Sequence, residues 1–197
     1  MDWLLLATGV TGGITFDFVV RWLFRAVFTP PSVSSHFSPK GGCTEAIVNE
    51  LNHARHEILV LAYSFSSKPI AQALIDAKTR GVKVEIVLDK SNEQEQYSDL
   101  SFFMEQGLAP LIDSHHAIAH NKVIIIDKRT LLTGSFNFTH QAEAENAENM
   151  LVIKGHPELA SVYHGHFAEH KAHSQPPKAR NATQEHGHQH GVSRKAA

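Results

Sequence analysis

Cysteine is almost absent from the sequence of 197 residues, because Cys43 is the only one. A single thiol cannot form an intrachain disulfide, and zinc fingers that depend on several cysteines are excluded. An excess of positive charge is also missing, since the formal net charge is −2. The chain therefore lacks the global basic field that typically marks nucleic-acid binding. A local basic patch is the alternative, and its candidates lie close together in the sequence: Lys68, Lys78, Arg80, Lys83 and Lys90.

Long apolar runs are scarce as well, and the run near the start of the chain is interrupted by charge. Residues 3–16 carry no charged side chain, but Asp17 and Arg21 follow. A transmembrane helix needs about 20 apolar residues, a signal peptide needs a basic start and a small-residue cleavage site, and an interfacial helix needs only one apolar face. The start is not basic and no clear A-x-A site follows, which favours an uncleaved anchor. We expect residues 1–28 to be a hydrophobic membrane anchor or signal segment, with residues 3–24 meeting the membrane.

The rest of the chain divides by composition into a linker, a folded domain and a tail. Residues 29–42 are rich in proline, serine and glycine, which is typical of a linker. Residues 43–173 alternate helical and strand patterns, and this alternation predicts an α/β layer structure. Residues 174–197 are polar and rich in histidine, so we expect a disordered tail. Expected helices cover residues 44–55, 69–80 and 157–171, and expected strands cover residues 57–65, 82–88, 110–112, 121–127, 130–133 and 150–153.

The most informative stretch begins at His120 and Lys122. The residues that follow, 123–126, are β-branched and apolar on both faces, as in a buried central strand. Side chains alternate along a strand, so His120 and Lys122 share a face. A second strand is expected just after, and beyond it Ser135 and Asn137 share a face if the chain stays extended. The four side chains can therefore meet at one point, where they suit a phosphate: the imidazole attacks phosphorus or moves a proton, the ammonium balances charge, and the other two hydrogen-bond its oxygens.

Together these residues form the ungapped pattern H-x-K-x4-D-x6-G-S-x-N, in which Asp127 and Gly134 complete the set. The pattern resembles the signature of the phospholipase D superfamily. Its flanks, AYSF at residues 62–65, GSFNFT at 134–139 and ENAEN at 145–149, look like those of the small bacterial Nuc-type endonucleases of that superfamily, and more distantly those of the mitochondrial cardiolipin hydrolases. The resemblance implies a mixed β-sheet flanked by helices on both faces, and it covers roughly residues 37–171.

The resemblance also assigns roles around the motif. Glu148 follows Asn137 by eleven residues, and a carboxylate there would accept a hydrogen bond from one ring nitrogen of His120 and fix its tautomer. A surface glutamate before a strand is the alternative. Asp127 is expected to be structural, because its position in the strand points it away from His120.

The chain holds one copy of the motif, although cleavage through a covalent step needs both a nucleophile and an acid. We therefore expect a homodimer that shares one active site. One His120 attacks phosphorus to form phosphohistidine, and the other protonates the departing oxygen and then activates water. Lys122 of both subunits, with Ser135 and Asn137, would stabilise the transition state. No metal or other cofactor is expected, because the lysines supply the positive charge.

Two substrate classes fit this chemistry. The motif flanks favour a non-specific endonuclease that cuts DNA, with RNA as a second substrate. The apolar N-terminal segment instead favours a membrane-anchored phospholipase that acts on a lipid such as cardiolipin. The mitochondrial relatives carry a cysteine-rich zinc element that this sequence lacks, which lowers the second hypothesis. We expect a bacterial protein that is anchored or exported. The basic residues after the apolar segment would place the domain in the cytosol, whereas the related nucleases are exported, so the side of the membrane stays open.

One further motif lies near the C-terminus, where His166 to His170 reads HFAEH and fits the zinc-binding pattern H-x-x-E-H. Such a site needs a third ligand on an ordered element downstream, and only the tail follows. We therefore expect no zinc site here. The expected structure is a helix whose apolar side packs on the sheet through Leu159, Val162, Tyr163 and Phe167, and whose histidines are exposed to solvent: His156, His164, His170 and His173.

Overall fold

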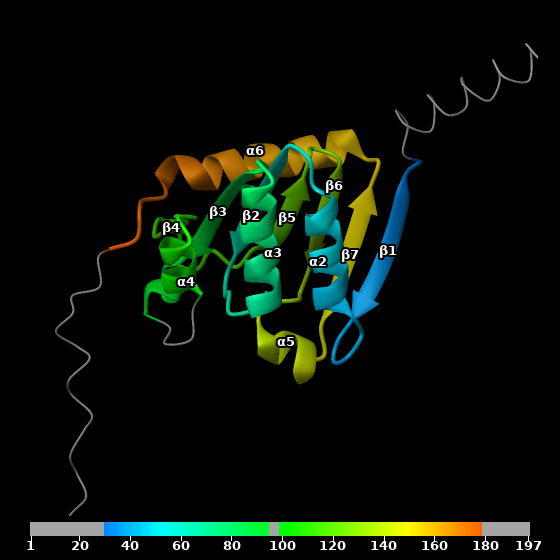
Figure 1. Ribbon diagram of the computed structural model, residues 1–197, viewed down its shortest axis with the longest axis horizontal. Helices are drawn as coiled ribbons and strands as arrows, with labels where there is room; N and C mark the ends of the chain where they lie inside the picture. Colours follow the sequence, from blue (N-terminus) through cyan, green and yellow to red (C-terminus); the bar gives the residue numbers. More distant parts are fainter. Residues whose placement is uncertain (1–29, 95–98, 179–197) are drawn as a thin grey trace, which may run out of the picture.

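The computed structural model describes residues 30–94 and 99–178, which form a seven-stranded sheet with helices on both faces (Figure 1). The strand order is β1-β7-β6-β5-β2-β3-β4. The strands are β1 (Ser32–Phe37), β2 (Glu57–Ala62), β3 (Lys83–Asp89), β4 (Leu111–Asp113), β5 (Lys122–Ile126), β6 (Thr130–Gly134) and β7 (Asn149–Lys154). Neighbours β2, β3 and β4 run parallel and the other pairs are antiparallel, so the expected mixed α/β sheet is confirmed.

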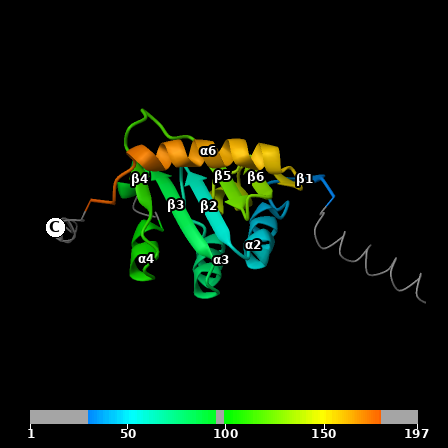
Figure 2. The same ribbon diagram turned by 90° about the horizontal axis from the view of Figure 1, so that it is seen from above.

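The helices lie in two layers, as Figure 2 shows. One face of the sheet carries α2 (Cys43–His53), α3 (Lys68–Thr79) and the short α4 (Leu100–Glu105), and the other face carries α6 (Pro157–His173). The short α5 (His140–Ala144) lies beyond the sheet edge. Alternation along β5 divides the core accordingly, because Ile124 and Ile126 pack with the α2 and α3 layer while Val123 and Ile125 pack with the α6 layer. A strand buried on both faces explains its uninterrupted run of β-branched residues.

The hairpin between β5 and β6 is a two-residue turn. Asp127 and Lys128 both have positive φ, 52° and 53°, and the amide of Arg129 donates to the carbonyl of Ile126 at 3.0 Å. This geometry matches the type I′ turn, whose twist fits that of the two strands it joins. The turn sets the register in which Val123 pairs with Thr133, and that register brings the start of β5 beside the end of β6.

Two expected boundaries are wrong. Residues 32–37, which composition placed in a linker, form β1 and pair antiparallel with β7 at the sheet edge. Strand β1 is exposed along most of its length, so its sequence has no apolar signature to mark it. At the other end, the tail expected from residue 174 begins inside the fold: Ser174 is buried, and Gln175 exchanges two backbone hydrogen bonds with Ile112 in β4.

The expected membrane anchor falls on residues 1–28, outside the described residues, as do residues 179–197 of the tail. Within residues 30–94 and 99–178, no helix combines the length and apolar character that a membrane crossing needs.

Candidate active site

Four strands begin or end along the border of the sheet that lies next to α5 in Figure 1. This border of strand ends is called the active-site edge. Ala62 ends β2 and pairs with Lys122, which begins β5. Gly134 ends β6 and pairs with Met150 near the start of β7. Antiparallel pairing therefore gathers the residues before β5, after β6 and before β7 at one place, although they are spread over the sequence from 120 to 149.

His120 and Lys122 lie against the same aromatic ring. The rings of His120 and Tyr63 are 4.5 Å apart between centroids, and the Lys122 Nζ lies 5.0 Å from the Tyr63 centroid. His120 is exposed, whereas Lys122 is only 7% exposed. An accessible imidazole thus lies beside a buried ammonium, and Tyr63 is a contact that the motif itself does not reveal.

Burial changes the electrostatics of Lys122. Loss of solvation lowers the pKa of this lysine below its ordinary value, and the negative charge of Glu148 partly offsets the effect by raising it. The Nζ has one weak hydrogen bond, to the His120 carbonyl at 3.5 Å. An ammonium held this way gains from an anion placed beside it, because the anion replaces the lost hydration.

The expected partnership between Glu148 and His120 is not found within the described part of the chain. The Glu148 carboxylate instead accepts hydrogen bonds from Ser135 Oγ at 2.6 Å and from Asn146 Nδ2 at 3.1 Å. Ser135 Oγ in turn accepts from the backbone amide of Asn149 at 3.1 Å and from its Nδ2 at 3.3 Å. The single hydroxyl proton of Ser135 is directed to Glu148, so this serine positions the carboxylate in this state of the protein.

The side-chain amide of Asn137 has a buried oxygen whose hydrogen-bonding capacity is not used within the described residues. Its Oδ1 lacks a hydrogen-bond partner among the described residues. A buried unsatisfied amide oxygen is costly in a folded protein, on the order of 1–3 kcal/mol. Because the oxygen and nitrogen of an amide are assigned from their partners, the same position can also offer an N–H donor.

The glycine of the pattern, Gly134, has a direct steric cause. A Cβ built on this residue would lie 2.2 Å from the carbonyl oxygen of Asn149 and 2.9 Å from the Cα of Met150. Both are backbone atoms of β7 and cannot move aside cheaply. Glycine is therefore needed for β6 and β7 to approach closely where Ser135 and Glu148 lie.

Asp127 lies at the opposite end of β5 from His120, which agrees with the structural role expected for it. Its Oδ1 accepts the backbone amides of His56 at 2.7 Å and Glu57 at 2.9 Å, and its Oδ2 accepts that of Arg55 at 2.9 Å. The side chain thus fixes the chain entering β2 against the hairpin after β5.

The candidate basic patch is divided between two edges. Lys68 and Lys90 lie at the active-site edge, where α3 begins and β3 ends, whereas Lys78, Arg80 and Lys83 lie where α3 ends and β3 begins. All five bond within the chain: to Asp99, to the carbonyls of His116, Gly107 and Leu51, and to Glu85. They do not form one phosphate-binding surface.

The expectation of solvated histidines on α6 is wrong for two of them. His170 is buried and His173 is half-buried, and both contact Asp113 of β4. The apolar side of this helix is also narrower than expected, because Phe167 is buried while Val162 is 69% exposed. Sequence reasoning missed Asp113 and its neighbour His116 altogether, since neither lies in a motif.

A sheet edge that presents histidine and lysine beside a hydroxyl, an amide and a carboxylate defines a phospholipase D-like hydrolase. The sequence profile described as "Cardiolipin synthase, PLD-like domain" matches residues 47–171. The chain belongs to the phospholipase D superfamily and is a phosphodiester hydrolase.

Individual relatives agree with this assignment. "Phospholipase D" of Rickettsia bellii is 40% identical over 181 residues, which cover 85% of this chain and 90% of the relative. The crystal structure of a phospholipase D family member, Nuc from Salmonella typhimurium, is 36% identical with a TM-score of 0.72, and the match covers 75% of this chain and 98% of Nuc. A "Mitochondrial cardiolipin hydrolase" of Chlamydomonas reinhardtii is 32% identical over 117 residues, 59% of this chain and 52% of that protein. The Rickettsia relatives place the chain among bacterial proteins.

Proposed function

We propose that this hydrolase is a metal-independent endonuclease with little sequence preference, which cuts DNA and also RNA through a phosphohistidine intermediate. The observation that carries the proposal is the pair formed by the exposed His120 ring and the buried Lys122 ammonium, both of which lie against the Tyr63 ring. The likeness of the motif flanks to the small bacterial endonucleases supports a nucleic-acid substrate.

The reaction needs two imidazoles in opposite protonation states, and each chain provides one at this edge. In the proposed homodimer, Nε2 or Nδ1 of one His120 attacks phosphorus and forms a P–N bond. The second His120 gives its proton to the departing oxygen, and the P–O bond breaks. That second ring, now neutral, takes a proton from water as the water attacks phosphorus and releases the first His120.

Lys122 supplies positive charge to the pentavalent phosphorus. Its ammonium is poorly solvated by the protein, so a phosphate oxygen brought to it gains more than it would beside a hydrated surface lysine. Asn137 adds an amide whose buried Oδ1 has no hydrogen-bond partner among the described residues. Ser135 donates a hydrogen bond to Glu148, and the negative charge of Glu148 raises the pKa of Lys122 against the effect of burial.

A lipid phosphodiester such as cardiolipin is the second candidate, and one surface feature favours it. Phe37 is 60% exposed, and it pairs with Asn149 at the active-site edge. Leu151, 37% exposed, lies on the same sheet face two pairs along that ladder, opposite Ser35. An apolar rim beside the site suits a lipid substrate, and several relatives carry phospholipase or cardiolipin hydrolase names.

The deciding experiment offers the full-length protein in detergent two substrates in excess EDTA: plasmid DNA and vesicles that contain cardiolipin. We expect the plasmid to be nicked and the lipid to remain intact. His120→Ala should abolish nicking, whereas His140→Ala, which changes another exposed histidine near this edge, should leave it unchanged.

Two outcomes contradict the proposal. Cleavage of cardiolipin without cleavage of DNA would reassign the substrate to a lipid. Loss of nicking in EDTA that Mg²⁺ restores would contradict the metal-independent mechanism, because the chemistry itself would then require an ion.

We also propose that residues 1–28 anchor or export the domain, on the strength of their apolar sequence. Membrane fractionation of cells that express the full chain, compared with a variant in which Leu4, Leu5 and Leu6 are changed to Gln, tests this. We expect the full chain to sediment with membranes or to leave the cytoplasm, and an unchanged distribution in the variant would contradict the proposal.

A further inference from the structure

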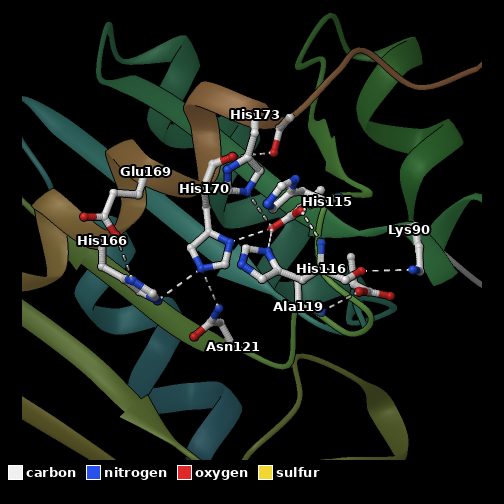
Figure 3. Close-up of polar contacts among 12 residues, drawn as sticks. Lys90, His115, His116, Ala119, Asn121, His166, Glu169, His170 and His173 are labelled. Carbon is white, nitrogen blue, oxygen red and sulfur yellow. Dashed lines mark hydrogen bonds and ion pairs between the residues drawn. The ribbon is translucent and has the colours of Figure 1, made fainter.

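Three histidines surround one carboxylate oxygen of Asp113, at the end of β4 (Figure 3). The Oδ2 atom of Asp113 lies 2.5 Å from Nδ1 of His170, 3.0 Å from Nδ1 of His116 and 3.3 Å from Nε2 of His173. Asp113 is fully buried where β4 ends, and His170 is 5% exposed on α6. His116 comes from the loop after β4 and is exposed, so the cluster is reachable from solvent.

We propose that Asp113, His116, His170 and His173 bind a divalent transition-metal ion, with zinc as the best fit. One ligand atom from each residue lies within 4.8 Å of the other three. Tetrahedral Zn²⁺ with bonds of about 2.0–2.1 Å requires its ligand atoms to be about 3.3 Å apart. Small side-chain rotations would lengthen the shortest distance between ligand atoms, 2.5 Å, and shorten those that approach 4.8 Å. The four atoms would then form the coordination shell.

The donor set selects the metal. Three imidazole nitrogens and one carboxylate oxygen suit zinc and its neighbours in the transition series, whereas Mg²⁺ and Ca²⁺ prefer oxygen ligands throughout. Each imidazole must be neutral and must present a bare nitrogen, so the ion displaces the protons that now point at Asp113, and binding weakens in acid. Burial by itself raises the pKa of the Asp113 carboxyl, but hydrogen bonds from His170, His116 and His173 outweigh it and hold that pKa well below its usual range.

A second layer of contacts holds the ligand rings. Nε2 of His170, the nitrogen turned away from Asp113, lies 3.1 Å from Nε2 of His166 and 3.4 Å from Nδ2 of Asn121. Partners on the outer nitrogen fix the ring orientation and the tautomer of a metal-bound histidine. Lys90 Nζ donates to the carbonyl of His116 at 2.9 Å and restrains the loop ligand in the same way.

The site would be structural, because four protein ligands complete a tetrahedral shell and leave no open position for substrate. It joins three segments: β4, the loop after it, and α6. That loop continues through Ala119, whose amide donates to Asp89 Oδ2 at 2.7 Å, into His120. Asn121 lies between His120 and Lys122 and also contacts His170. An ion here would therefore fix the loop that delivers His120, while the reaction itself uses no metal.

The H-x-x-E-H pattern, taken alone, indicates His166 and His170 as ligands, but His166 lies outside the four-residue cluster. His166 and Glu169 lie near each other at 3.7 Å, but Glu169 is exposed and points away from Asp113 (Figure 3). The helix contributes His170 and His173 instead, three residues apart and therefore on one face.

Measurements of metal content and of metal spectra test the site without an activity assay. The full chain is stripped with EDTA, dialysed and titrated with Zn²⁺, and separately with Co²⁺, whose visible absorption reports tetrahedral coordination. His186, His188 and His190 of the tail could bind metal on their own, so the reference protein carries His→Gln changes at all three. We expect one tightly bound equivalent per chain, a visible Co²⁺ spectrum, and a rise in melting temperature with Zn²⁺.

The variant His116→Gln removes a ligand from an exposed loop and should leave the fold intact. We expect it to bind Zn²⁺ at least about 100-fold more weakly and to lose the Co²⁺ spectrum. His140→Gln, an exposed histidine outside the cluster, should bind as the reference does. His173→Gln removes a second ligand, and we expect the same loss of Zn²⁺ affinity and of the Co²⁺ spectrum in this variant. Absence of a tight equivalent in the reference, or tight binding that survives both His116→Gln and His173→Gln, would overturn the proposal.

Discussion

The hydrogen bonds of Asp127 predict that this residue of the motif acts on stability and not on the reaction. Its carboxylate accepts three backbone amides, and its own backbone is left-handed with φ of 52°. We expect the loss of stability to be largest for Asp127→Ala, smaller for Asp127→Gly and smallest for Asp127→Asn. Each variant, once folded, should keep the kcat of the natural chain.

The magnitudes follow from the surroundings of each amide. The amides of Arg55 and His56 belong to exposed residues that water can reach, so the loss of each bond costs about 1 kcal/mol. The amide of Glu57 is half-buried, and its loss costs about 1–3 kcal/mol. Alanine adds about 1–2 kcal/mol for left-handed backbone, which glycine avoids. We therefore expect a loss of about 5 kcal/mol for alanine and roughly 1 kcal/mol less for glycine.

Asparagine separates charge from geometry. It tolerates the left-handed backbone and can keep both bonds that Oδ1 accepts, but it replaces Oδ2 with an N–H₂ group that faces the amide of Arg55. The expected loss is about 1–2 kcal/mol. Urea denaturation at a fixed protein concentration measures the series. Equal losses for alanine and asparagine, or a fall in kcat that exceeds the unfolded fraction, would refute the structural role.

Three further predictions concern the active-site edge. Gly134→Ala should cost about 2–3 kcal/mol in urea denaturation, because its Cβ would overlap the Asn149 carbonyl; an unchanged midpoint would contradict the close approach of β6 and β7. Glu148→Gln removes the charge that raises the pKa of Lys122, so this already lowered pKa falls further and the alkaline limb of the kcat/KM profile should move to lower pH; a limb that stays in place would contradict the coupling. Equal co-expression of natural and His120→Ala chains should give about one quarter of full activity if the dimer shares one site, and about one half would indicate independent sites.

Much of the fold and of the half-site was predictable because the signals are local. The run from Val123 to Ile126 is apolar on both faces, and this alone indicates a central strand. His120 and Lys122 adjoin that strand, while Gly134 and Ser135 end the next one across a two-residue turn. The observed hairpin places the start of β5 beside the end of β6, where the four residues lie.

The errors arose where local composition conflicts with tertiary pairing. Strand β1 is exposed and serine-rich, and it is a strand because β7 has an unpaired edge beside it. The position of Ser135 as a partner of Glu148 likewise depends on the register between β6 and β7. The chemistry of the residues predicted that Ser135 would hydrogen-bond a phosphate, and the resemblance gave the role of Glu148. Neither specifies which hydrogen bond each residue makes in a single chain.

The histidine cluster shows why a motif can be weak while a nearby site is well built. Asp113 and His116 precede His170 by more than fifty residues, and no spacing rule links them. Parallel pairing of β4 with β3 sets the position of Asp113. Phe167 of α6 packs against the sheet, and this packing orients the helix so that His170 faces Asp113. Both causes are non-local, so only the folded chain brings the four ligands together. A buried carboxylate surrounded by imidazoles is costly to assemble for packing alone, and a bound cation would stabilise that arrangement.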